Sequence, residues 1–132
     1  MSQLRVLIIS AIIAILAFAA LSSSYVIKRD IADIRKQNAK DAQALQDKFE
    51  TFTEDTECEP DQIACIKGDF AKCATVATED GKLVNKYQIQ KCNTGLTCFA
   101  LPLVTKPGTS LVCTTKEDRD ARFDQAEKNL KR

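Results

Sequence analysis

All six cysteines of this chain lie in residues 58–113, which have the sequence CEPDQIACIKGDFAKCATVATEDGKLVNKYQIQKCNTGLTCFALPLVTKPGTSLVC. They are Cys58, Cys65, Cys73, Cys92, Cys98 and Cys113, with six, seven, eighteen, five and fourteen residues between neighbours. An even number of cysteines in a short region behind an apolar N-terminus indicates a disulfide framework. No two neighbours show the close spacing, about two to four residues, that zinc sites prefer. The sequence therefore predicts three disulfides and no metal site, with about fifteen possible pairings left open.

Turn signals divide the same stretch into short segments. Lys67-Gly68, Asp80-Gly81, the run 93–95 and Pro107-Gly108 each separate residues that favour strands. Asp-Gly is among the strongest signals for a tight hairpin. We therefore expect residues 58–114 to form a small disulfide-rich all-β domain of about five short antiparallel strands. Domains of this size bury little surface, so cross-links supply much of their stability.

The N-terminus has the pattern of an export signal. Arg5 precedes the apolar run Val6–Leu21, and small residues follow it. This pattern predicts a signal peptide over residues 1–24, and hence a secreted protein of the extracellular space or cell wall without stable membrane insertion after cleavage. The alternative is an uncleaved anchor, although the run is shorter than the ~20 residues that span a bilayer. The dibasic pair Lys28-Arg29 is a candidate second processing site.

Residues 30–52 contain neither glycine nor proline, and their apolar side chains recur on one face. Ile31 and Ala42, like Ile34 and Leu45, are eleven residues apart, which is close to a whole number of helical turns. The segment is predicted to be an amphipathic helical spacer. Its apolar stripe leaves two other roles open, packing on the disulfide domain and self-association.

Two polar segments flank the cysteine-rich region. Residues 53–57 are acidic and are predicted to be a linker. Residues 115–132 begin with Thr115 and have Asp118 three positions later, a loose form of the helix-capping signature. We expect this last segment to be a short polar helix or a disordered tail.

The charge balance and the absence of histidine narrow the range of functions. The chain has 132 residues, with 19 basic side chains, 18 acidic ones and no histidine. Near-zero net charge argues against a nucleic-acid partner. Missing histidine removes the commonest general base, and the carboxylate pairs Glu79/Asp80 and Glu117/Asp118 lie in turn or helix-cap contexts. The sequence therefore predicts a protein that is not an enzyme and needs no cofactor.

A polar run around a tyrosine is the candidate binding surface. Tyr87 stands between Asn85, Lys86 and Gln88. A tyrosine ring can cover the C–H face of a sugar, while amide and amine groups bind its hydroxyl and N-acetyl groups. The alternative is a Tyr87 half-buried against the neighbouring strand. Phe99, beside Cys98, is expected to belong to the core.

Three segments of the chain resemble a known family: Cys65–Cys73 (CIKGDFAKC), Cys92–Pro102 (CNTGLTCFALP) and Gly108–Cys113 (GTSLVC). Together with Tyr87 five residues before Cys92, they resemble carbohydrate-binding module family 19, whose members are small fungal chitin-binding domains. The resemblance spans about Cys58 to Thr114. It departs from the family pattern in having no tryptophan and a long, charged segment over residues 75–86.

The resemblance implies chitin or N-acetylglucosamine oligomers as the ligand, and it implies an aromatic role for Tyr87. A second hypothesis is a small disulfide-stabilised effector or toxin-like protein that binds a protein partner. A third is a signal-anchored surface protein that assembles through its helix. Oligomeric state is left open.

Overall fold

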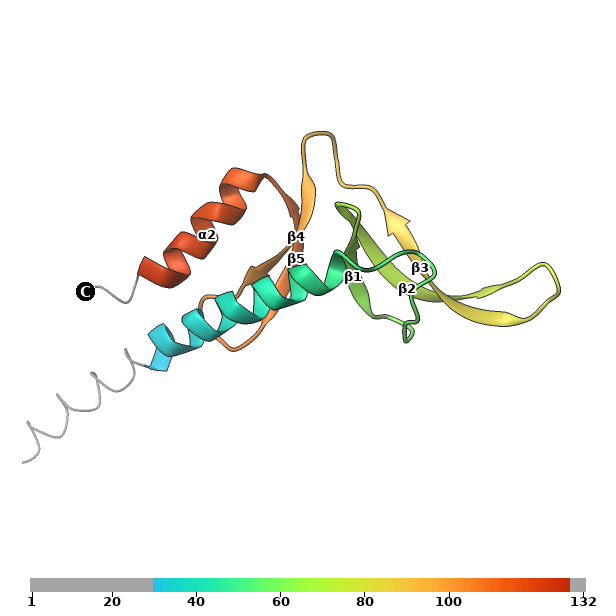
Figure 1. Ribbon diagram of the computed structural model, residues 1–132, viewed down its shortest axis with the longest axis horizontal. Coiled ribbons are helices and arrows are strands. Elements are labelled where there is room, and N and C mark those ends of the chain that lie inside the picture. Colours follow the sequence, from blue (N-terminus) through green and yellow to red (C-terminus); the bar gives the residue numbers. More distant parts are fainter. Residues whose placement is uncertain (1–29, 129–132) are drawn as a thin grey trace, which may run out of the picture.

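The structure is a computed structural model that describes residues 30–128 (Figure 1). Five antiparallel strands form two small sheets, and two helices pack against them. In chain order the elements are the N-terminal helix over residues 30–49, β1 (Ile63–Ile66), β2 (Asp69–Ala77), β3 (Leu83–Gln90), β4 (Thr97–Pro102), β5 (Thr109–Thr114) and α2 (Lys116–Lys128). This confirms the predicted fold class, a small disulfide-rich domain of five strands preceded by a helix.

β1, β2 and β3 form the first sheet, with β2 in the centre. The two-residue turn Lys67-Gly68 joins β1 to β2, and its residues have φ values of 51° and 83°. Two positive φ angles define the hairpin turn whose twist matches that of the strands. β2 and β3 extend as a long arm away from the rest of the molecule (Figure 1). The turn at its tip contains Asp80-Gly81, as predicted, and the Gly81 amide donates to the carbonyl of Thr78 at 2.9 Å.

β4 and β5 form the second sheet, and the N-terminal helix holds the turn between them. Asn38 on that helix is only 2 % exposed. Its Nδ2 donates to the carbonyls of Leu103 at 2.8 Å and Lys106 at 2.9 Å, and its Oδ1 accepts from the Gly108 amide at 2.8 Å. These three hydrogen bonds satisfy the buried amide and fix the turn against the helix.

The N-terminal helix is part of the domain. Ala42 and Phe49 on its inner face are 0 % and 5 % exposed and belong to the same core cluster as the strand residues. Gln46 accepts a hydrogen bond from the backbone amide of Ala100 in β4 at 2.9 Å. Of the roles left open by the sequence, packing on the disulfide domain is therefore the observed one, and a separate spacer is not. The helix ends at residue 49 and not at 52, because the chain turns there to bring the rings of Phe49 and Phe52 to 5.5 Å.

Three disulfides cross-link the β domain. The pairs are Cys58–Cys73, Cys65–Cys98 and Cys92–Cys113. Cys65–Cys98 joins β1 to β4 and so links the two sheets, while Cys92–Cys113 joins the β3–β4 connection to β5. The three predicted disulfides are confirmed, and the structure selects one of the pairings that the spacing left open.

α2 covers one end of the second sheet (Figure 1). The Asp118 amide donates to Oγ1 of Thr115 at 3.2 Å, so the predicted cap is present. Ala126 is 1 % exposed, and the Arg119 guanidinium lies 4.8 Å from the centre of the Phe99 ring. Phe99 is 9 % exposed, which confirms its place in the core.

Several predictions fall on residues outside those described. They are the signal peptide over residues 1–24, processing at Lys28-Arg29 and the final residues 129–132. Between residues 30 and 128, neither helix is long and apolar enough to cross a membrane.

Candidate binding site

The four predicted site residues lie on β3 but do not form one surface. Side chains alternate between the two faces of a strand, so Asn85 and Tyr87 lie on one face while Lys86 and Gln88 lie on the other. Tyr87 is buried, and the other three are exposed.

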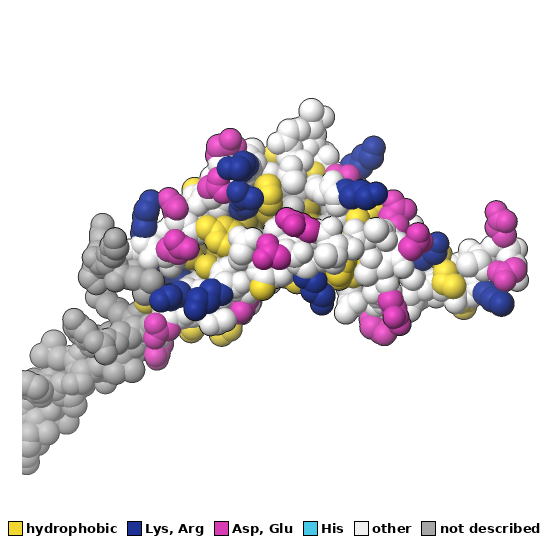
Figure 2. Space-filling view, viewed as in Figure 1, with side chains coloured by type: hydrophobic (Ala, Val, Ile, Leu, Met, Phe, Trp, Pro, Cys, Tyr) yellow, Lys and Arg dark blue, Asp and Glu magenta, His cyan; other side chains and the backbone are white. Residues whose placement is uncertain are grey.

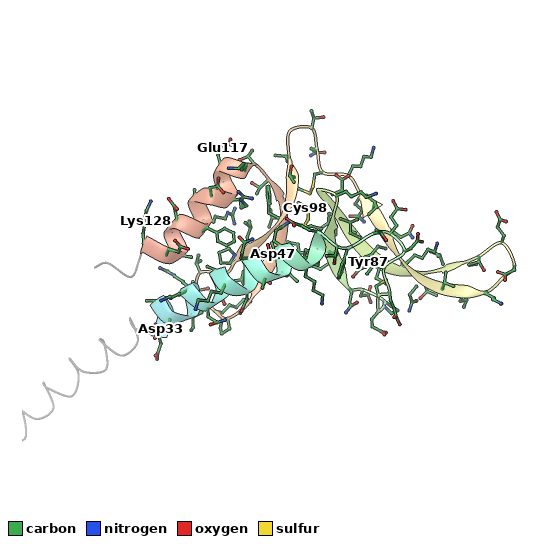
Figure 3. All side chains as sticks on the ribbon, in the orientation of Figure 1. Asp33, Asp47, Tyr87, Cys98, Glu117 and Lys128 are labelled. Carbon is green, nitrogen blue, oxygen red and sulfur yellow. A yellow bond between two sulfur atoms is a disulfide. The ribbon has the colours of Figure 1, made fainter. Side chains whose placement is uncertain are left out.

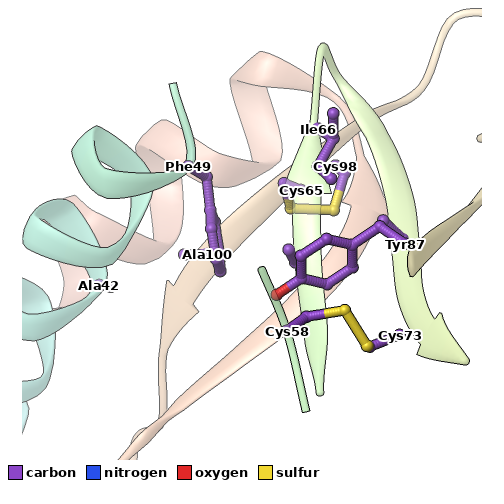
Figure 4. Packing of buried hydrophobic residues seen from close by; sticks show 11 residues of the cluster. Ala42, Phe49, Cys58, Cys65, Ile66, Cys73, Tyr87, Cys98 and Ala100 are labelled. Atoms are coloured by element: carbon purple, nitrogen blue, oxygen red, sulfur yellow. A yellow bond between two sulfur atoms is a disulfide. The ribbon is translucent and has the colours of Figure 1, made fainter. Parts of the chain in front are cut away.

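Tyr87 lies in the core, which differs from its predicted role as an exposed stacking platform. Its side chain is 4 % exposed, and it stands opposite Cys73 on β2 (Figure 4). Its ring centre lies 6.0 Å from that of Phe52. Burial raises the pKa of the Tyr87 hydroxyl, because the ionised form is poorly solvated there. Neither face of the ring is open to a sugar in this arrangement, and Tyr87 is buried more completely than the half-buried alternative expected.

Two of the exposed residues are engaged in contacts at the surface. The Oγ1 of Thr75 donates to Oδ1 of Asn85 at 2.8 Å, across the β2–β3 ladder. Nζ of Lys86 lies 3.0 Å from Oδ1 of Asp55. Gln88 is exposed on the same face as Lys86. The three exposed side chains therefore do not surround an aromatic ring.

The predicted linker is ordered along the free edge of β3. The Tyr87 amide donates to the carbonyl of Glu54 at 3.3 Å, and the ion pair from Lys86 to Asp55 lies next to it. The amide of Thr53 donates to Oγ1 of Thr56 at 2.8 Å, which closes the segment on itself. The site residues on β3 therefore position residues 53–56.

This segment forms one wall of a surface groove of about 320 Å³. The opposite wall is formed by the β1–β2 turn and the end of β3. The lining residues are Thr53, Glu54, Asp55, Ile66, Lys67, Asp69, Ile89 and Lys91. Ile66 is 2 % exposed and Ile89 is half-buried, so Ile89 supplies most of the aliphatic surface at the floor of the groove. Charged side chains surround that floor.

Local structure accounts for the positions of the charged groups. Lys67 occupies the first position of the β1–β2 turn, where its positive φ directs the chain sharply back. Oδ1 of Asp69 accepts a hydrogen bond from the Cys92 amide at 3.1 Å, which holds the β3–β4 connection beside the groove. Lys91 follows the end of β3 directly and is exposed.

Sequence reasoning missed the groove residues. The Lys67-Gly68 turn was recognised as a turn, yet nothing in the sequence places it beside residues 53–55, which precede β1. That proximity depends on the Cys58–Cys73 disulfide and on the packing of Phe52 against Tyr87. Both are contacts between residues far apart in the chain.

Two carboxylates within residues 30–128, Asp80 and Asp120, have a pKa that is lowered from the ordinary value. A hydrogen bond from Thr78 lowers the first, and hydrogen bonds from Lys116 and Arg119 lower the second. In the same part of the chain no group of three or more His, Cys, Asp or Glu residues could hold a metal ion.

Comparison with known proteins gives no further assignment. No family model, no curated protein and no solved structure matches this chain.

Proposed function

We propose that the protein is a non-catalytic binding module for chitin or N-acetylglucosamine oligomers. The observation that carries the proposal is the groove beside β3, in which polar and charged side chains surround the aliphatic side chain of Ile89. The resemblance of the cysteine segments to chitin-binding modules supports the same ligand.

The groove suits the two kinds of surface that a pyranose presents. The C–H face of a sugar ring is apolar and can pack on Ile89. Its hydroxyl and acetamido groups need donors and acceptors, which Lys67, Lys91 and Glu54 supply around the floor. A volume of about 320 Å³ lies at the lower end of the range for small-ligand sites. Sugar binding at this groove would be shallow and weak for a single ring.

Tyr87 takes a different part in this proposal from the one that the sequence suggested. It is a positioning residue, because its ring packs on Phe52 and its amide binds Glu54 at the groove wall. Lys86 acts in the same way through Asp55. Neither needs to touch the sugar.

Extracellular location belongs to the proposal as well. Three disulfides with no free cysteine are typical of proteins that fold in an oxidising compartment. Secretion itself follows from the predicted signal peptide.

Binding to chitin beads, and titration with soluble chitin oligomers followed by NMR, test the proposal. Replacing two groove cations together, Lys67→Asn and Lys91→Ala, should weaken oligomer binding roughly tenfold, since charged hydrogen bonds are lost. Asparagine is chosen at residue 67 because it tolerates positive φ. The matched control is Lys106→Ala, whose exposed side chain lies outside the groove. No retention of wild-type protein on chitin would refute the function; equal retention of both variants would refute the site.

A second candidate, a protein-binding effector, rests on the β2–β3 arm. Leu83 at its outer end is 74 % exposed, and this end of the edge strand β3 lies beyond Tyr87, where residues 53–56 cover the edge. Edge strands can pair with an extended segment of another protein. The variant Leu83→Asp separates the two functions, because a chitin-binding module should keep its retention on chitin with this change and an effector should lose its partner.

A further inference from the structure

A larger groove lies between the N-terminal helix and α2 and has a volume of about 630 Å³. Ala39, Ala44 and Phe123 contribute its apolar surface. Figure 2 shows hydrophobic surface between these two helices, bordered by basic and acidic side chains. The groove is remote from the candidate sugar site, because it involves no residue of the first sheet.

The charges at this groove balance. Lys36 and Lys40 line it together with Asp47 and Glu127. A groove with no net charge offers little attraction to a strongly anionic or cationic partner. It favours a partner whose charges are themselves arranged in a complementary pattern.

The charges on the N-terminal helix are self-complementary when two copies of the helix lie antiparallel. Lys40 and Asp47 are two helical turns apart on the same face, at a separation of about 10 Å along the axis. Their midpoint falls between Gln43 and Ala44. A second copy laid antiparallel across that midpoint would bring its Asp47 to Lys40 and its Lys40 to Asp47, which is the symmetry of a two-fold interface.

The residues at this midpoint permit a close approach. Ala44 is exposed, and its single methyl group keeps the surface flat. Within residues 30–128, Lys36 and Lys40 form no ion pair, and Asp47 accepts a hydrogen bond from Nε2 of Gln43 at 2.8 Å. Figure 3 labels Asp47 on the N-terminal helix. Among the residues that the structure describes, Lys40 and Asp47 therefore have no ionic partner.

We propose that two copies of this protein associate through the groove between the N-terminal helix and α2, with their N-terminal helices antiparallel and Lys40 of each copy paired with Asp47 of the other. The dimer would hold two β domains on opposite sides of the helix pair. This proposal does not depend on which ligand the β domain binds.

Charge exchange tests the arrangement, with sedimentation equilibrium of the disulfide-bonded protein across the micromolar range as the measurement. Wild type should dimerise. Lys40→Glu and Asp47→Lys should each raise the dissociation constant at least about tenfold, because each substitution places like charges together at both symmetric contacts. A mixture of the two variants should recover the wild-type affinity as a heterodimer, since every contact is then a pair of opposite charges.

Asp41→Lys is the matched control. Asp41 is exposed and accepts a hydrogen bond from Gln37 at 2.8 Å, just as Asp47 does from Gln43, but it does not line the groove. Its replacement should leave the dimer unchanged while removing the same kind of helix contact. A wild-type protein that remains monomeric would overturn the proposal. So would an equal effect of the Asp41 variant, or a mixture of the two groove variants that fails to associate.

Discussion

Asn38 is the buried polar side chain on which the β4–β5 turn depends. Replacing it with alanine would leave two carbonyls and one amide of the turn without partners in a site that is 2 % exposed. Unsatisfied buried groups cost about 1–3 kcal/mol each, and partial hydration offsets some of the loss. We expect Asn38→Ala to lower the free energy of unfolding by about 2–4 kcal/mol in a denaturant titration with disulfides intact.

Asn38→Asp provides the sharper comparison. Asparagine and aspartate side chains have nearly the same shape. The aspartate carboxylate, however, would face the carbonyls of Leu103 and Lys106, to which Nδ2 of Asn38 now donates. The aspartate variant should be the less stable of the two at neutral pH and should regain stability as acid protonates it. Gln37→Ala, on the exposed side of the same helix, should change stability by less than about 0.5 kcal/mol. Equal stability of the wild type and the aspartate variant would show that the amide does not hold the turn.

Tyr87 makes the stability of the protein sensitive to alkali. Its pKa in the folded state is raised by burial above the ordinary value of about 10. The unfolded chain therefore loses the proton first, so the contribution of Tyr87 is complete below about pH 10 and declines as pH rises further. We expect Tyr87→Phe to show a smaller loss of stability above that pH than wild type, measured by denaturant unfolding on both sides of it. If the free energy of unfolding varied with pH in the same way for both proteins, the Tyr87 hydroxyl would be exposed to water and not buried.

The burial of Tyr87 could not be predicted from the sequence around it. The alternation of a strand was evident around Tyr87, but which face was buried depended on the register that sets Tyr87 opposite Cys73. A shift of one residue would have exposed the ring and buried its neighbours. The length of the β2–β3 turn sets that register, but which face is buried follows from residues far along the chain, among them Phe52, whose ring packs on Tyr87.

The N-terminal helix contributes buried side chains to the core. Phe49 is 5 % exposed and contacts Phe52 and the strand residues of the core cluster. Phe49→Ala should lower the free energy of unfolding by about 3–5 kcal/mol, the usual result of removing a buried aromatic ring. Gln43→Ala, exposed on the same helix, is the control. If the helix were detached from the domain in solution, both substitutions would have the same small effect.

Some elements were predictable because their signals are local. Lys67-Gly68 and Asp80-Gly81 lie at the two turns of the first sheet, where glycine permits positive φ. Thr115 caps α2 as its sequence indicated. The packing of the N-terminal helix was not predictable, since the buried Asn38 looks like any polar residue until Leu103 and Gly108 are placed beside it.

Cys65–Cys98 is the disulfide that joins a strand of the first sheet to a strand of the second. The sheets otherwise meet through side-chain packing and a few hydrogen bonds, such as that from the Cys98 amide to the Gly68 carbonyl at 2.8 Å. Replacing both cysteines with alanine should lower the free energy of unfolding by about 3–4 kcal/mol. Thermal unfolding followed by circular dichroism measures the loss. A change below about 1 kcal/mol would mean that the sheets are held together without this disulfide.

The order of the disulfides has a consequence for digestion. Each enclosed segment overlaps the next: 58–73 overlaps 65–98, which in turn overlaps 92–113. Every peptide bond from residue 58 to residue 113 thus lies inside at least one covalent ring. A protease that cleaves once anywhere in this region leaves both pieces attached, and electrophoresis would reveal the nick only after reduction. A protein with these cross-links therefore stays in one piece after a single proteolytic cut between residues 58 and 113.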